Sequence, residues 1–175
     1  MMDAAARRQL AADIDAAARL TGTFVLRSGA TASEYFDKYR FEADPRLLSR
    51  VASAMSAQVP AEAEVLAGVE LGGVPIATAM SLANGMPAAF VRKEAKTYGT
   101  RLAVEGGDLA GKRVVIVEDV ISTGGAVRAA KARLDEVGAI TVAVVCALWR
   151  GPLPARIEGL DIPVLPALTL EDLQT

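Results

Sequence analysis

The chain has 175 residues, of which 52% are hydrophobic and 23% charged, and its formal net charge is −2. This length and composition predict one globular domain with a substantial core and exclude a disordered chain. The charge balance argues against nucleic-acid binding, which usually needs a basic excess. One cysteine and no histidine exclude an internal disulfide, a cysteine-based metal cluster and the serine–histidine and cysteine–histidine hydrolases. Any metal would be a hard cation bound through oxygen atoms.

The first 60 residues or so are predicted to form a small N-terminal hood. An alanine-rich helix is expected over residues 2–20. Charged residues are mixed with alanine in this segment, which therefore lacks the apolar core of a signal peptide. Short extended segments over residues 23–26 and 34–41 flank a turn. A further helix begins with the capping residue Asp44 and ends before Pro60.

From about residue 61 onward, apolar runs that read as strands alternate with helical segments. The expected strands are 64–67, 88–91, 113–117 and 140–148, and the expected helices are 74–84 and 124–137. This alternation predicts an α/β fold with a central, mostly parallel, Rossmann-like sheet flanked by helices, so that residues 1–175 form a single domain. The polar segment 92–107 interrupts the pattern, and a loop of that length is usually functional or disordered.

No apolar run in the sequence is long enough to span a bilayer. The longest covers only residues 140–149, whereas a membrane helix needs about 20. We therefore expect a cytoplasmic protein with no membrane association.

The segment from Val114 to Ala126 carries the clearest chemical signal. A buried β-branched run ends in Glu118 and Asp119, and a turn rich in hydroxyl groups and glycine then leads into a helix. Ligands of open α/β sheets bind at such carboxyl ends, and a helix N-terminus suits a phosphate. The carboxylates would repel that phosphate, which points to sugar hydroxyls or hydrated Mg²⁺ as their partners. The plainer interpretation is a solvated strand end followed by an ordinary helix cap.

Three segments resemble one known enzyme family. The segment from Glu118 to Ala126 resembles the phosphoribosyl-diphosphate signature of the type I phosphoribosyltransferases. Residues 24–29 and 90–99 resemble the N-terminal motif and the mobile catalytic loop of the orotate phosphoribosyltransferases. The resemblance implies the type I phosphoribosyltransferase fold. It also implies an activity in pyrimidine (UMP) biosynthesis: orotate is joined to the ribose of phosphoribosyl diphosphate, giving orotidine 5′-monophosphate and diphosphate.

The resemblance also assigns roles to residues of this chain. The catalytic residues it implies are Arg92, Lys96, Glu118 and Asp119. The residues it implies for binding phosphoribosyl diphosphate are Arg27, Leu71, Gly72, Gly73, Arg92, Lys93, Lys96, Tyr98, Glu118, Asp119, Val120, Ile121, Ser122, Thr123, Gly124, Gly125 and Ala126. The basic cluster of Arg92, Lys93 and Lys96 suits diphosphate as a leaving group, because cations stabilise the charge that grows as it departs. The plainer interpretation of this cluster is a solvated surface loop. The plainer interpretation of residues 70–73 is an ordinary turn.

The resemblance also implies a second set of residues, which contact orotate. They are Arg27, Tyr35, Phe36, Ser122 and Arg150. For the two aromatic residues the alternative is packing in the hood core.

Some positions depart from the family pattern. Trp149 stands where an aspartate is usual, and Tyr98 stands where the family loop often has histidine. Gly72 stands where many relatives carry lysine, so we expect backbone contacts alone at that position.

The resemblance further implies Mg²⁺, held mainly through ligand oxygens and water near Glu118 and Asp119. It implies a homodimer in which the loop lysine, Lys96, completes the neighbouring site.

Two other functions stay open. One is a phosphoribosyltransferase for another base such as a purine, against which the basic loop and the turn at residues 27–29 argue. The other is a regulator that senses phosphoribosyl diphosphate without turnover, which would usually add a basic or DNA-binding segment not found in this sequence.

Overall fold

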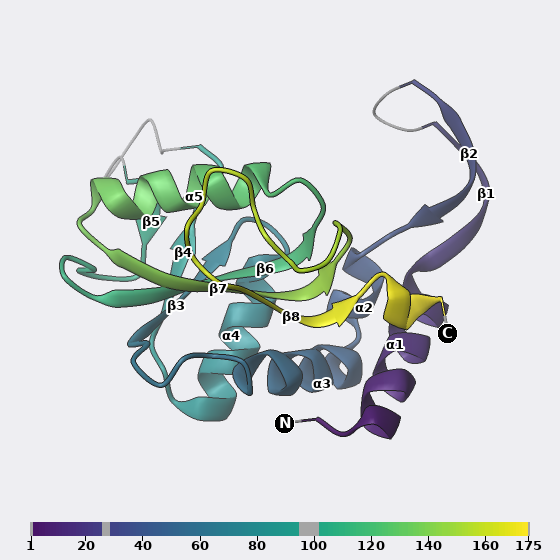
Figure 1. The fold of residues 1–175 in the computed structure, drawn as a ribbon, viewed down its shortest axis with the longest axis horizontal. Coiled ribbons are helices and arrows are strands. Elements are labelled where there is room, and N and C mark those ends of the chain that lie inside the picture. The colour runs from purple at the N-terminus through teal and green to yellow at the C-terminus, as the bar shows by residue number, and fades with distance from the viewer. Residues whose placement is uncertain (1, 26–28, 95–101, 175) are drawn as a thin grey trace.

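The computed structural model describes residues 2–25, 29–94 and 102–174. Its centre is a six-stranded sheet in the order β5-β4-β3-β6-β7-β8 (Figure 1). The strands are β3 (Val65–Val69), β4 (Ala88–Val91), β5 (Val104–Glu105), β6 (Arg113–Ile121), β7 (Ile140–Trp149) and β8 (Val164–Thr169). Neighbouring strands are parallel except for β4 and β5. The predicted α/β fold with a mostly parallel sheet is therefore confirmed.

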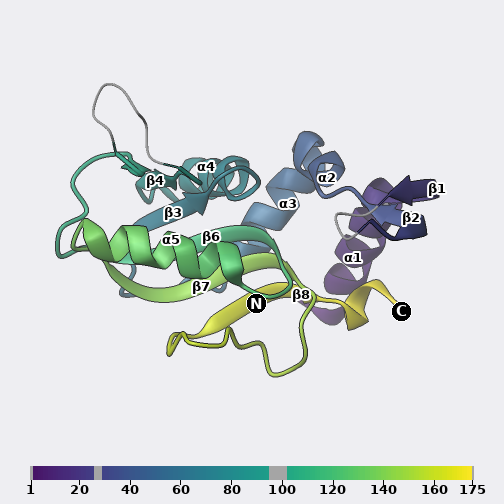
Figure 2. The same cartoon turned by 90° about the horizontal axis from the view of Figure 1, so that it is seen from above.

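Helices cover both faces of this sheet. Helices α3 (Pro45–Ser56) and α4 (Gly73–Asn84) lie on one face and α5 (Gly125–Glu136) on the other (Figures 1 and 2). Alternate residues of β6 divide between the two layers, with Val115 and Val117 in the core under α3 and α4, and Val114 and Ile116 in the core under α5. Burial on both faces explains why this strand is a nearly continuous β-branched run.

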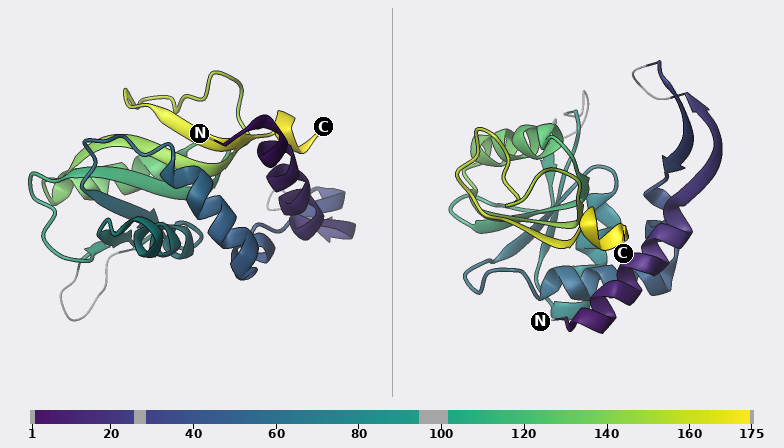
Figure 3. Two further views of the ribbon diagram at one scale, coloured as in Figure 1. Left: turned by 90° about the horizontal axis from the view of Figure 1, so that it is seen from below. Right: turned by 45° about the vertical axis from the view of Figure 1, so that its right-hand side comes forward.

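The N-terminal region builds the hood. Helix α1 (Ala4–Ala18) packs Leu10 and Ile14 into the core and leads into an antiparallel hairpin of β1 (Arg19–Val25) and β2 (Thr31–Phe36). This hairpin projects from the body of the molecule (Figure 3).

The prediction of an extended segment over residues 34–41 is wrong beyond Phe36. Residues Tyr39–Ala43 form the short helix α2. The Asp37 side chain accepts a hydrogen bond from the backbone N–H of Tyr39 at 3.3 Å, which turns the chain after the strand. The turn carries Phe41 into the core, where its side chain is fully buried.

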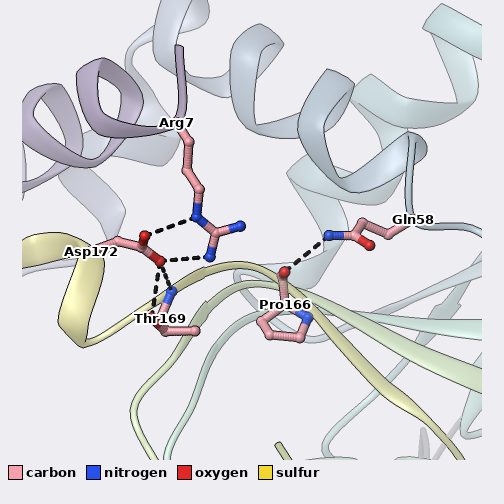
Figure 4. Close-up of polar contacts among 5 residues, drawn as sticks. All are labelled: Arg7, Gln58, Pro166, Thr169 and Asp172. Atoms are coloured by element: carbon pink, nitrogen blue, oxygen red, sulfur yellow. Dashed lines mark hydrogen bonds and ion pairs between the residues drawn. The ribbon is translucent and has the colours of Figure 1, made fainter. Parts of the chain in front are cut away.

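Strand β8 was not predicted because Pro166 lies within it. Proline is tolerated there because β8 is an edge strand of the sheet. The carbonyl oxygen of Pro166 accepts a hydrogen bond from Gln58 Nε2 at 3.0 Å (Figure 4).

The end of the chain is tied to α1 by a compact polar cluster (Figure 4). Asp172 lies in the 3₁₀ turn η1 (Glu171–Leu173) and accepts hydrogen bonds from Nε and Nη2 of Arg7, at 2.8 and 2.6 Å. The same carboxylate accepts hydrogen bonds from the backbone N–H and the hydroxyl group of Thr169. None of the helices in the described part of the chain has the length and apolar character needed to cross a membrane.

Candidate active site

Strand β6 runs four residues further than predicted, so Glu118 and Asp119 lie inside the sheet. Hydrogen bonding to β7 continues along this stretch, where Glu118 is paired with Cys146. Glu118 is 6% exposed and Asp119 has no exposed surface. The Asp119 backbone N–H donates to Glu118 Oε1 at 3.0 Å. The interpretation as a solvated strand end is therefore wrong, because these carboxyl groups form a buried pair.

Two hood residues complete this polar cluster. Lys38 Nζ lies 2.6 Å from Asp119 Oδ2, and the buried Glu42 approaches the same carboxylate from helix α2. Burial alone would lower the pKa of Lys38, but the hydrogen bond and charge of Asp119 outweigh it and raise the pKa. Burial likewise opposes ionisation of Asp119, yet hydrogen bonds with Glu118 and Lys38 hold its pKa below the usual value. The pair is thus an ammonium group bound to a carboxylate.

The pKa values of the neighbouring Glu42 and Glu118 are raised, unlike that of Asp119. Burial, reinforced by Asp119, raises the pKa of Glu42 to about 8. Burial and the charge of Asp119 raise the pKa of Glu118 to about 9. At neutral pH the cluster therefore holds one ion pair flanked by two protonated carboxyl groups. Such groups both donate and accept hydrogen bonds, which suits the hydroxyl groups of a sugar.

The turn before α4 closes tightly over this cluster. Leu71 is 61% exposed, whereas Gly73 is buried at the start of the helix. A Cβ atom added to Gly72 would lie 1.7 Å from Asp119 Oδ2 and 2.8 Å from Glu42 Oε1. No side chain fits residue 72 in this arrangement, so the turn can offer a ligand only backbone groups there.

A small cavity lies where β6 passes into α5. Its volume is about 180 Å³, and it is lined by Glu118, Val120, Ile121, Ser122, Thr123, Gly124, Gly125, Ala126 and Val127. Gly124 has a φ of +73°, and an added Cβ would lie 2.5 Å from Ile157, so glycine is required at this point. The N-terminal N–H groups of α5 border the cavity and favour a bound anion.

A larger cleft of about 470 Å³ lies beside the turn at residues 70–73. It is lined by Tyr39, Glu70, Leu71, Arg92, Lys93 and Glu94. Glu70 Oε2 accepts a hydrogen bond from the backbone N–H of Lys93 at 2.7 Å, which joins the turn to the basic segment. The structure thus brings Arg92 and Lys93 next to Leu71. Lys96 and Tyr98 lie outside the described residues.

The residues expected to contact orotate divide into three groups. The Arg150 guanidinium carbon lies 5.8 Å from the centre of the Phe36 ring, and the Arg150 N–H donates to the carbonyl of Ile121, next to Ser122. Arg150 therefore lies beside the Phe36 ring through its side chain and next to the Ile121–Ser122 segment through its backbone. Tyr35 instead pairs with Phe24 of the hairpin at 5.5 Å and is 46% exposed. Arg27 lies outside the described residues.

Sequence analysis missed Lys38 and Glu42. The expected extended segment over residues 34–41 left no helix α2 in this region. Lys38 is the N-cap of α2 and Glu42 lies four residues later, so recognising α2 would have been the signal that could find them.

The cluster suits a hydrated Mg²⁺ better than a metal held directly by the protein. Carboxyl oxygens are the donors that this ion prefers. Within residues 2–25, 29–94 and 102–174, however, no group of three or more acidic side chains is arranged to hold a metal. Asp119 is also engaged by Lys38. The fit is with an ion bound mainly to substrate oxygens and water.

Known proteins match this chain over most of its length. Residues 40–162 match the phosphoribosyl transferase domain. The orotate phosphoribosyltransferase of Nocardioides sp. is 54% identical, covering 94% of this chain and 92% of that protein. That of Methanocaldococcus jannaschii is 38% identical, covering 88% of each.

Solved structures match over almost the whole chain. Mycobacterium tuberculosis orotate phosphoribosyltransferase with inorganic phosphate gives a TM-score of 0.85 at 28% identity, covering 98% of this chain and 99% of that one. Its complex with 5-phospho-α-D-ribosyl 1-diphosphate gives 0.77 at 26% identity, covering 98% and 93%. The fold is the type I phosphoribosyltransferase fold that the resemblance implied. The chain therefore belongs to the phosphoribosyltransferase family, and within it to the orotate phosphoribosyltransferases.

Proposed function

We propose that this chain joins orotate to the ribose of phosphoribosyl diphosphate, forming orotidine 5′-monophosphate and releasing diphosphate. The observation that carries the proposal is the pairing of Arg150 with Phe36 beside the glycine-rich turn and the buried carboxyl groups. An aromatic face and a guanidinium group suit a flat, carboxylate-bearing base, since arginine can bind a carboxylate through two hydrogen bonds. The high identity to curated orotate phosphoribosyltransferases supports the same substrate.

In this proposal the cavity at the start of α5 binds the 5′-phosphate. The Ser122 and Thr123 hydroxyl groups and the N-terminal N–H groups of the helix are its donors. Glu118 and Asp119 hold the ribose hydroxyl groups and fix the sugar relative to the base. A fixed sugar and base react with a lower entropic barrier than free molecules do.

The diphosphate leaves from the cleft that Arg92 and Lys93 line. As the bond to the sugar breaks, positive charge grows on the ribose and negative charge on the leaving group. Cations in the cleft stabilise that growing negative charge, which is the main electrostatic contribution to the rate. By resemblance, Lys96, Tyr98 and Arg27 also bind phosphoribosyl diphosphate. Tyr35 is still expected to contact orotate.

Mg²⁺ completes the proposed site. Its role when bound is to neutralise charge on the diphosphate and so make it a better leaving group. Glu118 and Asp119 would hold water molecules of the hydrated ion by hydrogen bonds.

A homodimer is part of the proposal. Lys96 of one subunit would complete the site of the other, and symmetric dimers are the commonest soluble oligomers. We place the protein in the cytoplasm.

The test follows ultraviolet absorbance with phosphoribosyl diphosphate, with and without Mg²⁺. We expect Mg²⁺-dependent turnover of orotate and none of adenine, guanine, hypoxanthine or uracil. Turnover of a purine in place of orotate would indicate the other base specificity. Binding of phosphoribosyl diphosphate without turnover of any base would indicate a sensor.

A further inference from the structure

We infer that Lys38 binds the diphosphate group of phosphoribosyl diphosphate and gives up its ion pair with Asp119 to do so. This role rests on the proposed function and adds a residue that the sequence motifs do not include. Lys38 directly precedes helix α2 of the hood, far in sequence from the basic segment at Arg92 and Lys93.

The first observation is the position of the Lys38 ammonium group. It lies 2.6 Å from Asp119 Oδ2 and 5.4 Å from the centre of the Tyr39 ring. Tyr39 also lines the 470 Å³ cleft, together with Leu71 and Arg92. The ammonium group is therefore held between the buried carboxylate and the cleft in which the diphosphate is proposed to bind.

The second observation concerns accessibility. The Lys38 side chain is 34% exposed, whereas that of Asp119 is fully buried. A ligand that enters from solvent can reach the lysine but not the carboxylate behind it. Asp119 can bind a ribose hydroxyl group only after Lys38 has released Oδ2.

The third observation is the charge of the cleft. Among the described residues that line it, Arg92 and Lys93 are balanced by Glu70 and Glu94. Gly72 has no side chain and lies directly against Asp119. A diphosphate group needs additional positive charge on this side of the cleft, and among the described residues Lys38 is placed to supply it.

These observations fit a single exchange of partners. Lys38 moves its ammonium group from Asp119 to the diphosphate oxygens, so the cation is never left unpaired. The freed Asp119 oxygen then accepts a hydrogen bond from a ribose hydroxyl group. One ligand thus supplies both new partners, and a molecule that lacks either the diphosphate or the ribose supplies only one.

The experiment measures binding of inorganic diphosphate by isothermal titration calorimetry, with the full chain and Mg²⁺. Loss of a charge-assisted contact should raise the Kd of Lys38→Met by about 10- to 100-fold. Lys38→Arg, which keeps the charge, should stay within about fivefold of the unmodified protein. The KM for phosphoribosyl diphosphate should rise in parallel, while the KM for orotate at saturating phosphoribosyl diphosphate should change less than about threefold. Lys112→Met is the matched control, because Lys112 is exposed and pairs with Glu64 before the start of β6.

Unchanged diphosphate affinity in Lys38→Met would overturn the inference, and so would equal losses in Lys38→Arg and Lys38→Met. If Lys38→Met does not fold, the double variant Lys38→Met/Asp119→Asn is compared with Asp119→Asn alone. The double variant removes both charges, so it leaves no buried carboxylate without a partner. The double variant should again bind diphosphate more weakly, and equal binding would refute the role of Lys38. Failure of the unmodified protein to bind diphosphate would count instead against the proposed function.

Discussion

Asp119 is the residue on which the two parts of the site converge. It belongs to the central sheet, yet its ion-pair partner Lys38 and its neighbour Glu42 both come from the hood. The signature sequence indicated the two adjacent carboxyl groups but not what surrounds them. Their burial and their hood partners depend on contacts between segments about 80 residues apart, which no local pattern records.

Asp119→Asn tests the role of this carboxylate. The variant keeps the shape of the side chain and removes its charge, so the fold should survive. If Asp119 binds the ribose in the transition state, kcat/KM for phosphoribosyl diphosphate should fall by about 100-fold or more. Steady-state kinetics and circular dichroism together check this. Wild-type turnover in a folded Asp119→Asn protein would remove Asp119 from the catalytic residues.

Glu42 predicts a pH dependence of stability. Its pKa is about 8 in the folded protein against 4.5 for the ordinary group, so the folded state binds this proton more tightly. The contribution to stability is complete below pH 4.5 and is lost as the pH rises toward 8. Between pH 6 and pH 9 the wild-type Tm should therefore fall by about 4 °C more than that of Glu42→Gln.

The comparison with Glu42→Gln cancels the titration of Glu118, which both proteins share. Glu62→Gln, a substitution at an exposed position, should follow the wild-type profile. Parallel Tm profiles for wild type and Glu42→Gln would show that Glu42 does not carry the raised pKa.

At the scale of elements, the predictions were best where one segment determines its own structure. Strands β3, β4 and β7 and helices α4 and α5 follow from apolar runs and from turns rich in glycine. Helix α2 was missed because it is too short to show a period, and β8 because of Pro166. Strand β6 was ended too early because charged residues usually leave a strand, whereas here pairing with β7 continues past them.

The contact between α1 and the chain end gives a prediction at this scale. The side-chain hydrogen bond from Arg7 lowers the pKa of Asp172 to about 2, and Thr169 adds two more hydrogen bonds. This stabilisation is present above the ordinary pKa of 3.8 and is lost as the pH falls toward 2. Asp172→Asn should lower Tm by about 2–4 °C at pH 7, an effect of about 1 kcal/mol.

The matched control is Asp13→Asn, which breaks the more exposed pair of Asp13 with Arg50. Its Tm should change by less than about 1 °C, because exposed ion pairs contribute little. Equal effects of the two substitutions would show that the Asp172 cluster does not anchor α1.

At the scale of the whole molecule, the candidate site contains residues of both the hood and the sheet. The proposed dimer would contain two such sites. The hairpin that projects from the body (Figure 3) ends at Phe36, two residues before Lys38. Sequence resemblance assigned residues to the site, and these assignments stay predictions. It did not predict how the hood reaches Asp119, since that depends on the packing of α2 against α1 and α3.

A subunit-mixing experiment tests the shared site. If Lys96 acts in the neighbouring subunit and Asp119 in its own, Lys96→Ala and Asp119→Asn should each be nearly inactive. After exchange, half of the dimers are hybrids in which one site carries both defects and the other neither. Activity should then recover to about a quarter of wild type. Exchange confirmed by a mass tag, without any recovered activity, would show that Lys96 acts within its own subunit.

The most direct measurement follows the three species of the proposed reaction together. Purified protein is mixed with orotate, phosphoribosyl diphosphate and Mg²⁺, and orotate, orotidine 5′-monophosphate and diphosphate are quantified over time. We predict that orotate disappears at the rate at which the nucleotide and diphosphate appear, in equal amounts, and that Asp119→Asn slows all three alike. No nucleotide, or diphosphate released without nucleotide, would contradict the assignment of this site to orotate phosphoribosyl transfer.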